Sequence, residues 1–156
     1  DSNGPLRGLK GSVFEGGLRV PMIVRWPGHV PAGVEHDVAS GFEDHLPTIC
    51  EWIGATPPSD IDGISLSSTL TGGTVPERTW LYRELGGQQA LKSGKWKGVR
   101  RNLKKGDDAM MLFDLDADPG ETTDVAQMHP EVVLRISGMM AEAHEPSEVF
   151  PLPMID

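Results

Sequence analysis

The chain has 156 residues, with 14 Lys or Arg against 23 Asp or Glu, which gives a formal net charge of −9 at pH 7. This length is ordinary for one domain with its own core, and the acidic balance argues against nucleic acids or anionic membranes as partners, because both are polyanions. Cys50 is the only cysteine, which excludes an intramolecular disulfide, and no apolar run approaches the ~18 residues that span a bilayer.

The first part of the chain predicts loops that alternate with short elements. Residues 1–20 are rich in glycine and predict loop and turn, and Met22–Trp26 predicts a short buried strand. A helix is expected with Asp44 as its N-cap and Ile53 near its end. Cys50 falls on the apolar stripe of this helix, so we expect it to be a core residue and not a reactive thiol. The stripe comprises Leu46, Ile49, Cys50 and Ile53.

The second part predicts a sheet of consecutive strands after one helical turn. Ser65 is positioned to cap a single turn over Leu66–Leu70. Four strand-like runs follow, and Gly86-Gly87 and Ser93-Gly94 between them are typical of hairpins, so the strands should pair antiparallel. Asp118–Glu121, with Pro then Gly at its centre, suits a type II turn. The four runs are Thr79–Leu85, Gln88–Ser93, Lys95–Arg100 and Met110–Leu115.

A C-terminal helix is predicted from about Pro130 to Ala143. Proline at the first helical position and Glu131 in the first turn are typical of a helix start. Six apolar side chains repeat at helical spacing, which favours packing on the sheet over binding to a membrane surface. This face comprises Val132, Val133, Ile136, Met139, Met140 and Ala143.

The strongest candidate site lies in residues 8–21, Gly-Leu-Lys-Gly-Ser-Val-Phe-Glu-Gly-Gly-Leu-Arg-Val-Pro. Four glycines in fourteen residues indicate a tight loop whose backbone approaches another group closely. Lys10 offers a compact positive charge to a small anion, and the alternative is an ordinary turn with a solvated lysine. Glu15 and Arg19 are four residues apart, which suits a pair that holds the loop together. Nucleotide binding is unsupported, because a glycine separates the lysine from the serine and no Gly-x-Gly-x-x-Gly is present.

The segment Asn3–Pro21 resembles the second signature region of the sulfatases, in the alkaline-phosphatase-like superfamily. In that family the block runs roughly Pro-Leu-Arg-Gly-Gly-Lys-Gly-x-x-x-Glu-Gly-Gly-x-Arg-x-Pro, so Leu9 is a small departure. Five further segments match in family order over nearly the whole chain. They are Ile23–Gly28, Leu46–Thr48, Ile61–Leu66, Ser93–Lys97 and Leu112–Thr122.

The resemblance implies the C-terminal portion of a sulfatase, an enzyme that hydrolyses sulfate esters when complete. It also implies an α/β fold, here an α+β fragment. Residues 1–75 would end an alkaline-phosphatase-like α/β domain, and residues 76–156 would form a four-stranded antiparallel sheet packed by a C-terminal helix. In the family the lysine that matches Lys10 contacts the substrate sulfate. There its positive charge can neutralise the negative charge that develops on the leaving oxygen as the S–O bond breaks. Arg7 is a second candidate anion contact, with a salt bridge inside the loop as its alternative role.

The family's other active-site parts are not recognisable in this chain. The nucleophile is a formylglycine made from the cysteine of Cys-x-Pro-x-Arg, whereas Cys50 precedes Glu-Trp-Ile-Gly. The calcium site needs an Asp-Asn pair, but Ser2 stands before Asn3, which we assign to the loop leading to Arg7. We therefore expect calcium and formylglycine in the intact enzyme only, and this chain alone to be inactive.

Three other patterns yield no site. Asp114, Asp116 and Asp118 alternate as in a calcium loop, but Pro119 stands where that loop needs glycine and Val125 where it needs a bidentate Glu. The five histidines lack zinc-ligand spacing. No serine lies in a Gly-x-Ser-x-Gly motif, which disfavours a serine hydrolase.

A basic run surrounds Trp96, and we expect it to be a solvated hairpin. Its functional interpretation is a surface that holds a sulfated, polyanionic substrate such as a sulfated glycan. Two alternatives to the sulfatase stay open on the sequence: a phosphonate or phosphate-ester hydrolase of the same superfamily, and a non-catalytic module that binds sulfated glycans or a protein. The run comprises Lys95, Lys97, Arg100, Arg101, Lys104 and Lys105.

The chain opens within a motif and without an initiator methionine, which indicates a fragment or an internal domain. A truncated α/β domain exposes apolar surface that its missing part would cover. We therefore expect the isolated chain to self-associate.

Overall fold

The computed structural model describes residues 3–156, and the chain divides into two compact units. The first, which we call the sheet unit, comprises Asp1–Val20 and Thr79–Asp156. The second, the helical unit, comprises Pro21–Arg78. The glycine-rich stretch therefore belongs with the strands, although the helical unit separates them in the sequence. No helix of the described residues is long and apolar enough to cross a membrane.

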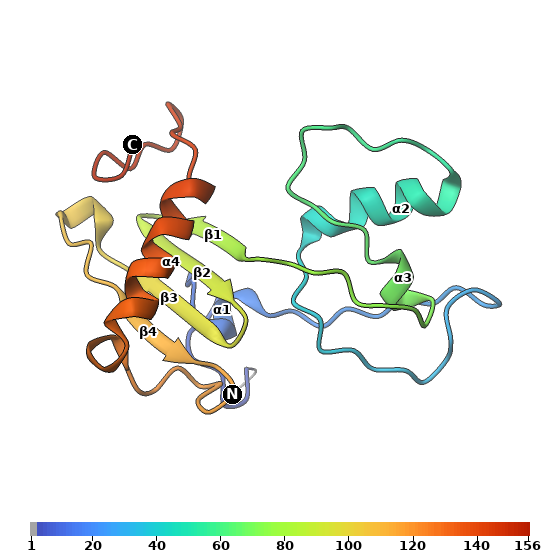
Figure 1. Cartoon of the computed structure of the whole chain (residues 1–156), viewed down its shortest axis with the longest axis horizontal. Coiled ribbons are helices and arrows are strands. Elements are labelled where there is room, and N and C mark those ends of the chain that lie inside the picture. Colours follow the sequence, from blue (N-terminus) through green and yellow to red (C-terminus); the bar gives the residue numbers. More distant parts are fainter. Residues whose placement is uncertain (1–2) are drawn as a thin grey trace. The chain divides into compact units, whose positions relative to one another are not determined.

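Four strands form the sheet in the order β1-β2-β3-β4, each antiparallel to the next (Figure 1). Leu85 pairs with Gln88 across Gly86-Gly87, whose φ values of 62° and 88° suit a two-residue hairpin turn. The predicted antiparallel sheet is thus confirmed. The strands are β1 (Leu81–Leu85), β2 (Gln88–Ser93), β3 (Trp96–Arg100) and β4 (Met111–Asp114).

Helix α4 (Pro130–Ala143) lies across one face of this sheet (Figure 1) and confirms the predicted C-terminal helix. Its side chains Val132, Ile136 and Met140 are buried against Leu91 and Leu112. A Cβ on Gly98 of β3 would lie 2.7 Å from the Ile136 side chain, so the glycine lets the helix approach the strand closely.

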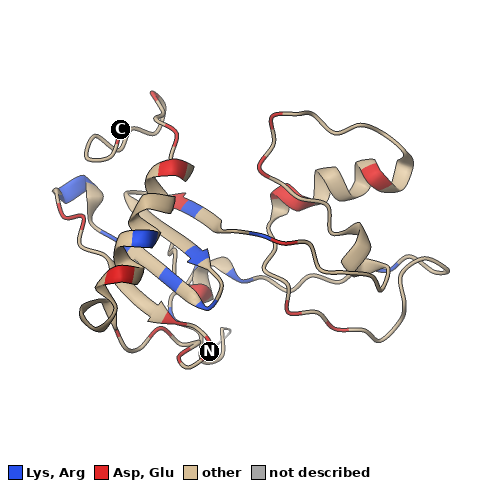
Figure 2. Cartoon of the chain, in the orientation of Figure 1, with Lys and Arg blue, Asp and Glu red and all other residues tan. Residues whose placement is uncertain are grey.

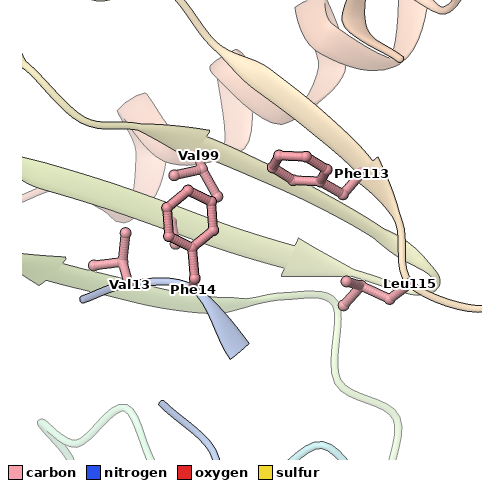
Figure 3. Packing of buried hydrophobic residues seen from close by; sticks show 6 residues of the cluster. Val13, Phe14, Val99, Phe113 and Leu115 are labelled. Carbon is pink, nitrogen blue, oxygen red and sulfur yellow. The ribbon is translucent and has the colours of Figure 1, made fainter. Parts of the chain in front are cut away.

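The other face of the sheet is covered by the N-terminal segment. Successive strand residues point to opposite faces, so Ala90 and Phe113 lie opposite the helix-facing Leu91 and Leu112. There they pack with residues 13 and 14 (Figure 3). The rings of Phe14 and Phe113 meet edge to face, with centroids 6.1 Å apart. The cluster comprises Val13, Phe14, Ala90, Val99, Phe113 and Leu115.

The helical unit contains α2 (His45–Ile53) and the single turn α3 (Ser67–Leu70). Both predicted elements are confirmed, with Gly54 in the left-handed conformation at the end of α2. Asp44, at the start of α2, is fully buried, and its carboxylate accepts hydrogen bonds from the main-chain N–H of Gly41 and Ile64. Cys50 is buried, as expected of a core residue.

Two expectations for the helical unit are wrong. Met22–Trp26 forms no strand, and the described residues of this unit contain no strand with which it could pair. Ile23 is 92% exposed. In the expected stripe of α2, Leu46, Ile49 and Ile53 are exposed, and only the cysteine is buried. Both segments have the apolar pattern of a buried element. Burial also requires a second element that packs against them, and the described residues contain none in that position.

The described residues also contain the short helix α1 (Glu15–Leu18) and three single-turn 3-10 segments. Phe42–Asp44 precedes α2. Leu103–Lys105 lies between β3 and β4, and Ala126–Met128 precedes α4.

Candidate functional site

Lys10 is exposed in a tight turn of the N-terminal loop. The main-chain N–H of Ser12 donates to the carbonyl of Leu9 at 3.1 Å, and Gly11 has a φ of 89° that suits glycine. Gln88 of β2 donates a side-chain hydrogen bond to the Gly11 carbonyl at 3.2 Å. Among the described residues Lys10 forms no ion pair, and its side chain is exposed.

The loop is closed from within by Asn3. Its side-chain amide donates to the carbonyls of Gly8 and Gly16 at 2.8 and 2.9 Å. The N–H of Gly16 in turn donates to the carbonyl of Arg7 at 2.7 Å. Asn3 therefore belongs to the loop, as we expected from the sequence, while Ser2 lies outside the described residues.

A short helix, α1 (Glu15–Leu18), follows where the sequence predicted only loop and turn. A Cβ on Gly17 would lie 2.2 Å from the Ser12 carbonyl oxygen, and one on Gly16 would lie 2.6 Å from that of Gly8. Real side chains do not tolerate such contacts, so the paired glycines let α1 fold directly against the loop that carries Lys10.

Arg7 is drawn inward and does not stand beside Lys10 as a second exposed charge. Its guanidinium donates to the Glu121 carbonyl at 2.8 Å and lies 4.0 Å from the centre of the Phe14 ring. The partner is a main-chain oxygen, not the carboxylate of a salt bridge within the loop. These contacts give Arg7 a structural role, and its role as an anion contact stays a prediction.

Beneath the loop lies a buried ionic cluster of Glu15, Lys97 and Glu121, which we call the Lys97 cluster. The Lys97 ammonium donates to Glu15 Oε1 at 2.7 Å and lies 2.9 Å from Glu121 Oε1. The other oxygen of Glu121 accepts the main-chain N–H of Glu15 at 2.6 Å. The Lys97 side chain is only 1% exposed. Arg19 donates to Glu15 Oε2 at 2.5 Å, which confirms the expected pair.

The two carboxyl groups of the cluster have pKa values shifted in opposite directions. Burial raises the pKa of Glu15, but the charges and hydrogen bonds of Lys97 and Arg19 outweigh burial and hold it below its ordinary value. Burial also raises the pKa of Glu121, and Lys97 offsets this only in part, so it lies above its ordinary value. The difference arises because Arg19 pairs with Glu15 alone, while the negative charge of Glu15 itself raises the pKa of Glu121.

The sequence interpretation missed this cluster. Lys97 was assigned to a solvated hairpin, which is wrong: it lies on the same face of β3 as Val99, in the core. That alternation was the available signal. The turn at Asp118–Glu121 forms, but the type II assignment is wrong, because Gly120 lacks a positive φ and Glu121 has a φ of 52°.

Three of the segments that resemble sulfatases therefore meet at one place. Glu15 comes from the glycine-rich stretch, Lys97 from Ser93–Lys97, and Glu121 from Leu112–Thr122.

The rest of the basic run is divided among different surroundings. Lys95 pairs with Asp114 at 2.5 Å, and the half-buried Arg100 donates to Ser137 of α4 at 3.1 Å. Lys104 and Lys105 are exposed on the 3-10 turn after β3. The run therefore does not form one continuous cationic surface.

The described residues do not fit the family's calcium ion. No group of three or more His, Cys, Asp or Glu in residues 3–156 is arranged to hold a metal. In the Lys97 cluster an ammonium group already occupies the place between the two carboxylates.

Comparison with known proteins assigns the family. The model for N-sulphoglucosamine sulphohydrolase, C-terminal, matches residues 9–145. Bovine arylsulfatase A is 36% identical over 83% of this chain, and human N-acetylgalactosamine-6-sulfatase is 33% identical over 97% of it. The chain spans only 30% and 29% of these two relatives.

Solved structures agree. One comes from work on the metabolism of multiple glycosaminoglycans by Bacteroides thetaiotaomicron. It superposes with a TM-score of 0.76 and 30% identity, over 89% of this chain and 32% of the other. A phosphonate monoester hydrolase from Silicibacter pomeroyi is less similar, with a TM-score of 0.51 and 26% identity over 64% of this chain and 24% of the other. The chain belongs to the sulfatase family, of which it carries the C-terminal portion.

Proposed function

We propose that this chain supplies Lys10 as a sulfate-contacting residue of an enzyme that hydrolyses sulfate esters. The supporting observation is that Lys10 is exposed and without an ionic partner among the described residues, while the loop around it is tied down at several points. An ammonium group held in this way neutralises charge on a bound sulfate and on the oxygen that leaves as the S–O bond breaks.

The remaining chemistry is proposed to come from residues outside this chain. Formylglycine and calcium are expected in the intact enzyme, and the described residues hold neither. We further propose that residues 1–75 belong to the catalytic α/β domain, whose active-site rim loop rests on the sheet formed within residues 76–156.

The proposed substrate class is a sulfated sugar. One relative is an N-acetylgalactosamine-6-sulfatase, and the exposed Lys10 offers a local positive charge to an anionic substrate despite the net charge of −9. Every Lys and Arg except Arg25 and Arg78 lies in the sheet unit, and Figure 2 shows some of them on the strands and others on α4 and in loops. Arg7 is retained as a proposed second contact.

Replacing Lys10 by Ala in the intact enzyme should lower kcat/KM for an aryl sulfate by about 10²-fold, as the loss of one charge-stabilising donor does elsewhere. The matched control is Lys104→Ala, which removes an exposed lysine from the same unit and should leave the rate unchanged. Steady-state kinetics of both variants tests the proposal. Wild-type activity in the Lys10 variant would overturn it.

The same assay addresses the alternative hydrolase. A phosphonate monoesterase is favoured only by the more distant structural neighbour, so a phosphonate monoester should be the poorer substrate. The alternative of a glycan-binding module without catalysis loses its main support, because Lys97 and Arg100 of the basic run turn toward the interior.

The isolated chain should self-associate, because large apolar side chains of the helical unit are exposed. Light scattering after gel filtration should give a mass above 16.9 kDa. The double variant Ile23→Lys/Phe42→Lys should reduce that mass, while Lys104→Ala should not. A monodisperse wild-type monomer would contradict this prediction. The exposed side chains are Ile23, Val34, Phe42, Leu46, Ile49 and Ile53.

A further inference from the structure

Glu121 holds both ends of the loop that carries Lys10. Before the lysine, the Glu121 carbonyl accepts the guanidinium of Arg7 at 2.8 Å. After it, the Glu121 carboxylate accepts the main-chain N–H of Glu15 at 2.6 Å. Glu121, which is distant in the sequence, thus contacts the loop on both sides of Lys10.

Glu121 is itself held by its surroundings. It is fully buried and contacts the ammonium group of Lys97, a residue of the inner strand β3. Among the described residues it is also the only one other than glycine with a positive φ. Such backbone is sparsely populated by residues with a side chain, and it persists where surrounding contacts hold it.

Neither contact is needed to complete the sheet. The strands pair through their own main chains, and α4 covers the opposite face. What the Lys97 cluster orders is the loop of residues 7–15, whose tip is the turn at Lys10 and Gly11.

We propose that Glu121 and Lys97 are positioning residues, which act on catalysis by fixing the loop that presents Lys10 to the sulfate group. The inference rests on the proposed role of Lys10, and it assigns a role in catalysis to two residues that do not contact the substrate themselves. A misplacement of about 1 Å in a catalytic group can lower the rate by up to about 10²-fold. Contacts that fix both ends of the loop should therefore raise the rate of the reaction.

The test is a double-mutant cycle in the intact enzyme, with Glu121→Ala made in the Lys10 and Lys10→Ala backgrounds. With Lys10 present, the substitution should lower kcat/KM for an aryl sulfate about tenfold. With Lys10 removed, it should change the remaining rate by less than about twofold, because the lysine that the contact positions is gone and the main-chain carbonyl that holds Arg7 is retained. Glu121→Gln keeps an oxygen that accepts the Glu15 N–H and should recover most of the loss. The control Glu131→Ala, at an exposed glutamate of α4, should have no effect in either background.

The outcomes separate the two proposals. If Lys10→Ala lowers activity but Glu121→Ala has no effect, or the same effect in both backgrounds, the positioning role is overturned and the role of Lys10 stands. If Lys10→Ala leaves activity unchanged, both fall. Should Glu121→Ala fail to fold, Glu121→Asp takes its place in both backgrounds, because the shorter side chain keeps the charge but does not reach the Glu15 N–H as Glu121 does. A loss of activity that depends on Lys10 then supports positioning, and no loss or an equal loss in both backgrounds overturns it.

Discussion

Replacing Lys97 by Met should lower the free energy of unfolding of this chain by about 3–5 kcal/mol, the range seen when one partner of a buried ion pair is removed. Met has a similar length but no charge, so Glu15 and Glu121 would remain buried beside each other without their shared counter-ion. Arg19 would still pair with Glu15, but no other cation is paired with Glu121 among the described residues. Urea denaturation followed by tryptophan fluorescence measures the change.

The pH dependence of this loss identifies its cause. Without Lys97, the folded-state pKa of Glu121 should rise further above its ordinary value of 4.5. A carboxyl group whose pKa is higher in the folded than in the unfolded state destabilises the fold at high pH, and this penalty disappears as the pH falls below the unfolded value. The difference between variant and wild type should therefore shrink as the pH approaches 4.5. A loss that is constant with pH would point to packing and not to charge.

Lys104→Met is the control for this experiment, because Lys104 is exposed on a 3-10 turn of the same unit. Its removal should leave the unfolding midpoint nearly unchanged. If Lys97→Met cost no more than Lys104→Met, the Lys97 cluster would not be what holds the N-terminal segment to the sheet.

Replacing Gly17 by Ala should cost about 3 kcal/mol of stability, at the upper end for an added methyl group in a packed interior. The new Cβ would lie 2.2 Å from the Ser12 carbonyl oxygen and 2.7 Å from that of Leu9. Both obstacles are main-chain atoms, which cannot rotate away as a side chain does. The loop must move, and with it Lys10, so activity of the intact enzyme should fall with stability.

Gly138→Ala provides the matched control for the glycine prediction. Gly138 lies within α4, and a Cβ there would meet nothing within 4 Å. Alanine is the better helix former by about 1 kcal/mol, so this variant should be slightly more stable than the wild type. Thermal unfolding of the two variants side by side measures both effects. Equal melting temperatures for Gly17→Ala and the wild type would mean that the loop is not packed as closely as described.

Features determined by neighbours in sequence could be predicted well. The Gly86-Gly87 link between two β-type runs predicts a hairpin with a single register, and the structure has that hairpin. Helix α4 begins at the predicted proline and ends at the predicted alanine. In both cases the signal and the structure it specifies lie within a few residues of each other.

Features that depend on distant partners were predicted poorly. Met22–Trp26 has the composition of a buried strand but no strand beside it among the described residues. Lys97 was expected in solvent, and only the distant Glu15 and Glu121 make its burial favourable. For the candidate site, the family resemblance identified Lys10 and the loop, while the residues that hold the loop became visible only in three dimensions.

The long sequence separation of these contacts also sets an order of events for a chain emerging from the ribosome. The hairpins of the sheet close between neighbours and can form as soon as their strands are made. Glu15 lies 82 residues before Lys97 and 106 before Glu121. Although its residues are synthesised before the strands of the sheet, the loop that presents Lys10 reaches its final shape only after residue 121 has left the exit tunnel.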